Sequence, residues 1–317
     1  MSRFSRRGCR RRSGRGGSGG TRVRVPRSVL ARREFLGLLA AAMATMTGCA
    51  ASAPGRPGTA AGISGDPGRG QAVPSWLLSR SALASVAASR TVAAGLARTR
   101  VYELLQPGQQ PLALADAWPA VIFTSVAGLV GAVRSGALPA RTQAVLYDPE
   151  AWPYTPASEQ RDPVAATATA AAAAHVAGLQ LIAAPALDLT SVLAPGHTAA
   201  RSQVFLELGL AARFAAHADV LALQAQSLER DAAGYASFVT AAAQQARHER
   251  PEVGLIAGLS TNPPGGPVSS QQIVAAIRAT QHLVDGYWLN IPAPGDRCPA
   301  CRQAQPYLGI AALSAVL

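Results

Sequence analysis

The sequence predicts an α/β fold, a single-domain (β/α)8 barrel of the TIM type, over residues 71–317. Short apolar runs alternate along this region with alanine-rich stretches, and that alternation is typical of βαβ units. The apolar runs are continuous rather than alternating, which indicates parallel strands that are covered on both faces. No Gly-x-Gly-x-x-Gly follows any of the runs, so a dinucleotide-binding sheet lacks its usual fingerprint and no nucleotide cofactor is expected.

The strands are predicted from their apolar runs, and a further segment before the first helix supplies the eighth. The count of eight favours a closed barrel over an open sheet. The predicted strands are residues 71–77, 100–105, 120–124, 143–148, 179–184, 219–224, 252–258 and 284–290.

The helices are predicted from alanine-rich stretches with polar starting residues. Ser269 or Ser270 precedes one stretch and Asp231 precedes another, and such residues cap helix N-termini. The predicted helices are residues 79–97, 163–177, 199–216, 232–247, 270–282 and 305–316.

The N-terminal region contains a paired positive charge, an uncharged apolar run and a small residue before a cysteine. Arg32-Arg33-Glu34-Phe35-Leu36 begins this segment, and Gly48-Cys49 ends it. The run is too short to cross a hydrocarbon core of about 30 Å as a permanent helix. The segment resembles a twin-arginine export signal that ends in a lipoprotein cleavage box.

The resemblance implies that residues 1–48 are removed and that Cys49 carries a lipid at the outer face of the cell membrane. Ordinary cleavage after Ala51-Ser52-Ala53 is the alternative and would give a secreted protein, although Pro54 is unfavourable just after a cut. Residues 49–70 are rich in Ala, Gly, Pro and Ser, which predicts a disordered linker to the barrel.

The net charge of +12 at pH 7 comes from the N-terminal segment. Twelve of the 29 basic residues precede Glu34, which leaves 17 Arg against the 16 remaining Asp and Glu. The barrel region is therefore near neutral, and we expect no nucleic-acid partner. The oligomeric state is not indicated.

Cys298 and Cys301 form a Cys-Pro-Ala-Cys motif near the end of the chain. Outside the membrane, a disulfide is the simplest interpretation of such a pair. A redox-active site and a zinc site are the alternatives, but the motif does not open a thioredoxin-like helix, and no further ligands lie close by. We therefore expect no metal centre.

Polar and aromatic residues follow the predicted strands at their carboxyl ends, where barrels of this kind place their active sites. Amides and carboxylates there are costly unless they meet partners or a ligand. Together with indole rings they suit a sugar, whereas a purely structural network is the alternative for Gln224 or Ser260, and capping of a following helix for Asp188 or Glu229. The predicted ligand-contacting residues are Tyr147, Trp152, Asp188, Gln224, Gln226, Glu229, Asn262, Trp288 and Asn290.

The segment Asp148-Pro149-Glu150 contains the pair of carboxylates that best fits a catalytic role. Residues two apart on a strand point the same way, so Glu150 is predicted as a catalytic acid and Asp148 as the group that orients it or stabilises charge. Here the chain resembles glycoside-hydrolase barrels. Asp-x-Glu at this strand end, with Trp288 on the last strand, is similar to the chitinase-type family, although that family's two earlier acidic positions are Gln143 and Leu146 here.

These observations predict an exported, membrane-tethered lipoprotein whose barrel hydrolyses glycosidic bonds in an envelope or environmental glycan. A barrel that binds a glycan or other polar ligand without turnover is the first alternative. A structural envelope protein with a filled barrel mouth is the second.

Overall fold

The computed structural model describes residues 74–112, 117–292 and 306–317. Eight parallel strands pair in sequence order and close into a barrel, as the sequence predicted. The predicted export signal, the linker, Cys49, Cys298 and Cys301 lie outside the described residues. The strands are β1 Ser75–Ser79, β2 Val101–Leu105, β3 Ala117–Phe123, β4 Ala144–Tyr147, β5 Gln180–Ala183, β6 Val220–Leu223, β7 Gly254–Ser260 and β8 Gly286–Asn290.

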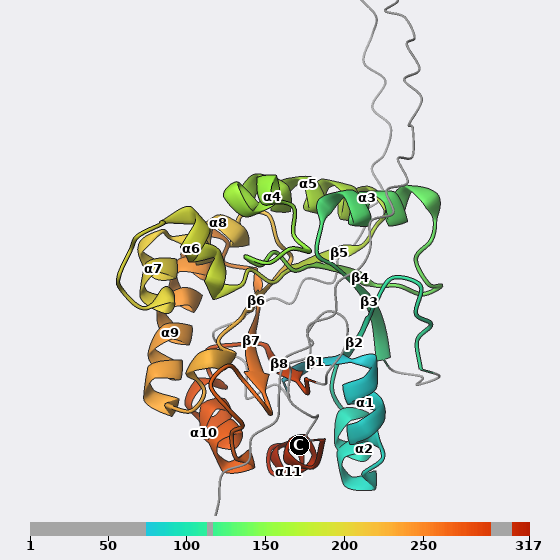
Figure 1. Ribbon diagram of the computed structural model, residues 1–317. Coiled ribbons are helices and arrows are strands. Elements are labelled where there is room, and N and C mark those ends of the chain that lie inside the picture. Colours follow the sequence, from blue (N-terminus) through green and yellow to red (C-terminus); the bar gives the residue numbers. More distant parts are fainter. Residues whose placement is uncertain (1–73, 113–116, 293–305) are drawn as a thin grey trace, which may run out of the picture. The chain divides into compact units, whose positions relative to one another are not determined.

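Helices lie around the outside of the strand ring (Figure 1). Short 3-10 turns, η1 Leu187–Leu189 and η2 Gln226–Leu228, follow β5 and β6. The helices are α1 Arg80–Ala87, α2 Arg90–Leu96, α3 Val126–Ser135, α4 Ala157–Arg161, α5 Pro163–Val176, α6 Thr190–Leu193, α7 Arg201–Glu207, α8 Leu210–Ala215, α9 Ala232–Glu249, α10 Ser270–Thr280 and α11 Pro306–Ser314.

Two predicted helices are each divided into two. The stretch 79–97 forms α1 and α2, and the stretch 199–216 forms α7 and α8. Gly209 separates the latter pair with a φ of 61°, a left-handed conformation that suits glycine and interrupts a helix. The predicted caps are present: the Asp231 side chain accepts the N–H of Ala233 at 3.1 Å, and Ser269 forms a capping box with Gln272.

Side chains alternate across the barrel wall with the two-residue period of a strand. Leu77, Leu146 and Ile256 belong to the cluster inside the barrel. Their chain neighbours Trp76 and Leu255 pack between the wall and the helices. This alternation determines which residues beyond each strand end face the mouth.

The ring closes where β8 meets β1. Ser75 and Gly286 are register partners in this pairing, and the N–H of Ser75 donates to the carbonyl of Asp285 at 2.9 Å. A Cβ on residue 286 would overlap the backbone carbonyl oxygen of Ser75. Backbone atoms rather than a flexible side chain occupy this space, so closure requires glycine here.

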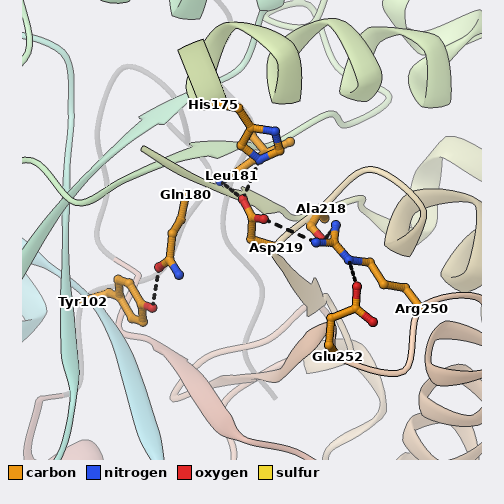
Figure 2. Close-up of polar contacts among 8 residues, drawn as sticks. All are labelled: Tyr102, His175, Gln180, Leu181, Ala218, Asp219, Arg250 and Glu252. Carbon is orange, nitrogen blue, oxygen red and sulfur yellow. Dashed lines mark hydrogen bonds and ion pairs between the residues drawn. The ribbon is translucent and has the colours of Figure 1, made fainter. Parts of the chain in front are cut away.

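Charged side chains tie strands together at the amino-terminal face of the barrel (Figure 2). The Asp219 carboxylate, just before β6, accepts the N–H of Leu181 at 2.8 Å and lies 2.8 Å from the Nε2 atom of His175. Arg250 reaches the same carboxylate at 3.6 Å and donates to the carbonyl of Ala218 at 2.8 Å. These contacts join β5, β6 and two helix ends.

Asp285 repeats this arrangement between β7 and β8. Its carboxylate accepts the N–H of Leu255 at 2.8 Å and lies 3.3 Å from an Arg247 nitrogen. The corresponding position of β3 is Pro119, whose carbonyl accepts the N–H of Gln143 at 2.9 Å. In the other two pairs the Asp carboxylate accepts a backbone N–H from the preceding strand, but Pro119 has no N–H to donate. The residue before β4 is a glutamine rather than an aspartate.

Among the described residues, no helix combines the length and apolar character that crossing a bilayer requires.

Substituting Gly286→Ala should lower the free energy of unfolding by about 2–3 kcal/mol, because the added methyl meets rigid backbone. Chemical denaturation followed by circular dichroism would measure this change. Gly131→Ala is the matched control, since residue 131 is an exposed position of α3 with no atom within 4 Å of an added Cβ. The control should raise stability by about 0.5–1 kcal/mol. Equal stability of both variants and wild type would contradict the requirement for glycine at closure.

Candidate functional site

Several predicted residues occupy inward-facing positions at the carboxyl end of the barrel. Asp148 lies two residues after Leu146, and Gln224 two residues after Ala222; both leucine and alanine belong to the interior cluster. Trp288 is itself in that cluster, and Asn290 follows it by two on β8. The two-residue period therefore brings all four predicted residues to the mouth.

The Gln224 amide connects the ends of β4, β5 and β6. Its Nε2 donates to Oδ1 of Asp148 at 2.7 Å and to the carbonyl of Ala184 at 2.8 Å. Asp148 is buried, and its own N–H donates to the carbonyl of Phe123 at 2.9 Å. Gln224 thus holds the Asp148 carboxyl group, and the Phe123 carbonyl holds the Asp148 backbone.

Glu150 lies in the loop after β4, because the strand ends at Tyr147. Its backbone N–H donates to Oγ1 of the buried Thr155 at 3.2 Å. Burial, and to a lesser extent the nearby Asp188 charge, raise the pKa of the Glu150 carboxyl to about 7, and a hydrogen bond from Gln224 opposes part of the shift. The Glu150 carboxyl therefore gives up its proton less readily than an ordinary glutamate.

Asp188 reaches the same place from the loop after β5. Its Oδ1 accepts the N–H of Ala151 at 2.9 Å, and the N–H of Ala186 donates to the carbonyl of Pro149 at 3.1 Å. These two bonds connect the loops after β4 and β5. The predicted residues Asp148, Glu150 and Asp188 therefore lie together, with Gln224 contacting the first two.

Trp152 and Tyr154 form an aromatic pair on the loop that follows Glu150. Their ring centroids are 5.0 Å apart at 75°, and Tyr154 is 44% exposed. The indole N–H of Trp152 donates to Oγ1 of Thr155 at 3.0 Å, and Gln160 donates to the Trp152 carbonyl at 2.8 Å. Thr155 thus supports both Glu150 and Trp152, a role that nothing in its sequence context indicated.

Tyr147 lies on the other side of the barrel wall. It is fully buried with Val121, Phe123 and Val145 against α3 and α5, and its hydroxyl donates to Oε2 of Glu159 at 2.8 Å. Tyr147 is one residue from Asp148, and adjacent residues of a strand face opposite sides. Its position therefore does not support the predicted ligand contact.

Glu229 is also enclosed rather than open to the mouth. No part of its side chain is exposed, and Oε2 accepts the N–H of Ser260 at 2.9 Å. Burial raises the pKa of the carboxyl to about 8, and the Ser260 N–H and the Arg230 charge oppose the shift. Glu229 ties the loop after β6 to the end of β7, as a structural residue would.

Asn262 and Gln226 differ in how their amides are placed. The Oδ1 of Asn262 is buried, and no described residue provides it with a hydrogen-bond donor. The Gln226 carboxamide is half-buried and lies across Gly258 of β7. Glycine inside a strand signals close approach of another group, and here that group is Gln226.

The described part of the chain contains no group of three or more His, Cys, Asp or Glu side chains that could hold a metal ion. The three carboxyl groups at the mouth are instead organised by amide and backbone donors.

Replacing Glu150→Gln should change the pH dependence of stability. The folded-state pKa is raised from 4.5 to about 7, so wild type loses stability as the pH rises through this window, whereas the glutamine variant does not. Relative to wild type, the variant should gain at most about 3 kcal/mol between pH 4 and pH 8. Thermal unfolding at both values tests this, with the exposed Glu249→Gln as control. Parallel stability curves for wild type and Glu150→Gln would contradict the raised pKa.

No protein-family model and no curated protein matches the chain. Solved structures with a similar fold include triosephosphate isomerase from Bartonella henselae, 11% identical, covering 69% of this chain and 92% of that chain with a TM-score of 0.39. A chitinase from Chromobacterium violaceum is 12% identical, covering 77% and 99% with a TM-score of 0.43. A chitinase from Pseudoalteromonas aurantia is 14% identical, covering 56% and 68% with a TM-score of 0.33. These likenesses assign none of those activities to this chain.

Proposed function

We propose that the barrel mouth hydrolyses glycosidic bonds in an envelope or environmental glycan, with Glu150 as general acid. The observation that carries the proposal is the placement of Glu150. Its half-buried carboxyl group lies beside Asp188 and Gln224 at the carboxyl end of the barrel, and its pKa is raised to about 7. A carboxyl group that stays protonated near neutral pH can donate a proton to the leaving oxygen.

Asp148 supplies the second role in this proposal. Glycoside hydrolysis passes through a transition state with positive charge on the sugar ring, and a nearby carboxylate stabilises that charge. Gln224 holds the Asp148 carboxyl at 2.7 Å through one N–H and contacts Glu150 as well. This shared partner holds the two acidic side chains close to each other at the mouth.

The aromatic residues fit the same substrate class. Trp152 and Tyr154 pair on the loop directly after Glu150, with Tyr154 exposed, and Trp288 lies in the interior cluster of the barrel. Sugar rings have apolar faces that pack on aromatic rings, and their hydroxyl groups need the hydrogen bonds that the amides provide. The ligand of the proposed reaction is therefore a carbohydrate.

Cleavage should be lost in Glu150→Gln while binding is retained, because glutamine keeps the shape of the side chain but carries no acidic proton. We expect a fall of at least ~100-fold in kcat. In wild type, the rate should decrease as the pH rises through about 7, since the protonated acid is then depleted. Mass spectrometry of products from a glycan array would measure both. Glu249→Gln serves as control.

Two outcomes would replace this proposal. Cleavage that survives in Glu150→Gln would exclude Glu150 as the acid. Binding without cleavage in both wild type and variant would make the protein a carbohydrate-binding barrel. Glu229 is enclosed, so binding would then depend on the other predicted mouth residues.

We propose further that the protein is exported and held at the outer face of the cell membrane by a lipid on Cys49. Support comes from Arg32-Arg33-Glu34-Phe35-Leu36 and the Gly48-Cys49 pair in the sequence.

Cys49→Ser should move the protein from the membrane fraction to the medium or leave the precursor uncleaved, because the acceptor thiol is gone. Fractionation with immunoblotting distinguishes these results, and Cys9→Ser is the matched control. An unchanged membrane-bound, processed protein in Cys49→Ser would exclude lipidation at this residue.

A further inference from the structure

The Gln226 carboxamide occupies space that a side chain would normally fill. A Cβ on Gly258 would lie 2.8 Å from both Cδ and Nε2 of Gln226 and 3.0 Å from its Oε1. All three atoms of the carboxamide are therefore packed against the backbone of β7. Such packing fixes the position of an amide that would otherwise be free to rotate.

Gly258 places this amide inside the mouth. It follows Ile256 of the interior cluster by two residues, so it faces the interior. Its register partner on β8 is Trp288, which is also in the interior cluster and only 8% exposed. Gln226 therefore reaches over β7 toward the Trp288 side of the mouth, away from the bond between Gln224 and Asp148.

Gln226, Trp288 and Asn290 supply the polar side-chain groups on this side of the mouth. Among the described residues, none forms a hydrogen bond with the side chains of Gln226, Trp288 or Asn290. Gln226 and Asn290 are half-buried, so part of each residue is accessible to solvent, whereas Trp288 is buried. Gln224, in contrast, has its amide N–H groups engaged with Asp148 and Ala184.

We propose that Gln226 is the specificity-determining residue of the mouth, where its amide binds an uncharged hydroxyl or amide group of the ligand beside Trp288. This inference rests on the proposed function, because it assumes that a carbohydrate enters the mouth. An amide carries no charge and offers both a donor and an acceptor, which suits a neutral polar group that also has both. The two glutamines after β6 thus have separate roles, Gln224 for the acidic groups and Gln226 for the ligand.

The test uses Gly258→Ala and Gln226→Ala with three uncharged probes: cellotetraose, chitotetraose and mannotetraose. Gly258→Ala adds a methyl group in the space that the Gln226 carboxamide occupies, so the amide has to move, and the atoms that this methyl group meets all belong to Gln226. For the probe that binds wild type, each single variant should raise the dissociation constant measured by calorimetry by ~10-fold. This factor corresponds to the loss of one hydrogen bond. Where the probe is cleaved, KM should rise by this factor with kcat within ~3-fold of wild type.

The double variant provides the decisive comparison. If Gly258→Ala acts by displacing Gln226, it should cause no further loss in the Gln226→Ala background. Gly131→Ala should bind like wild type, because its methyl meets nothing within 4 Å.

Unchanged binding in Gln226→Ala, an equal second loss in the double variant, or no binding of any probe to wild type would each overturn the proposal. Binding of a probe without cleavage by wild type would overturn only the hydrolysis proposal and leave the binding role of Gln226 open to the same test, so the two failures are distinguishable.

Discussion

Closure of the strand ring between β8 and β1 is the constraint on which the rest of the structure depends. The two strands approach so closely at Gly286 and Ser75 that no side chain fits between them. Once the ring is closed, every strand must place alternate residues inside and outside. The positions of Asp148, Gln224, Trp288 and Asn290 at the mouth follow from this alternation.

Loop-to-loop hydrogen bonds then convert strand ends into a site. The loops after β4 and β5 are joined through Ala151 and Asp188, and Gln224 adds the end of β6. These bonds bring carboxyl groups together in a buried setting, where burial and like charge both raise the pKa of Glu150. Loop geometry, more than the strands, therefore sets the acidity of this carboxyl group.

The fold could be predicted from the sequence because parallel strands buried on both faces leave continuous apolar runs. Strand ends were less predictable. The expected strand 143–148 stops at Tyr147, since Pro149 has no N–H with which to extend pairing. The single helix expected over 199–216 is interrupted at Gly209, which adopts a left-handed backbone conformation. A glycine in an alanine-rich stretch does not by itself indicate that the helix breaks there.

The position of a side chain at the mouth could be predicted where the residue continues the two-residue period of its strand. It could not be predicted where the conformation of a loop sets the position. Asp148 and Gln224 continue their strands, and a hydrogen bond joins their side chains at the mouth. Tyr147 is off by one residue, which is enough to put its ring outside the wall. Glu229 and Thr155 depend on loop conformations, so only the structure revealed that Glu229 is enclosed and that Thr155 supports the Glu150 loop.

Parallel pairing also has a consequence for how the barrel can be presented. All eight strands begin at one face, so the described chain enters β1 at Pro74 on the face opposite the mouth. The network around Asp219 in Figure 2 lies on that entry face. The attachment proposed above, made through the residues before Pro74, would therefore hold the barrel by the face opposite Asp148 and Glu150. The two ends of the strands would then have separate tasks, attachment at one and binding at the other.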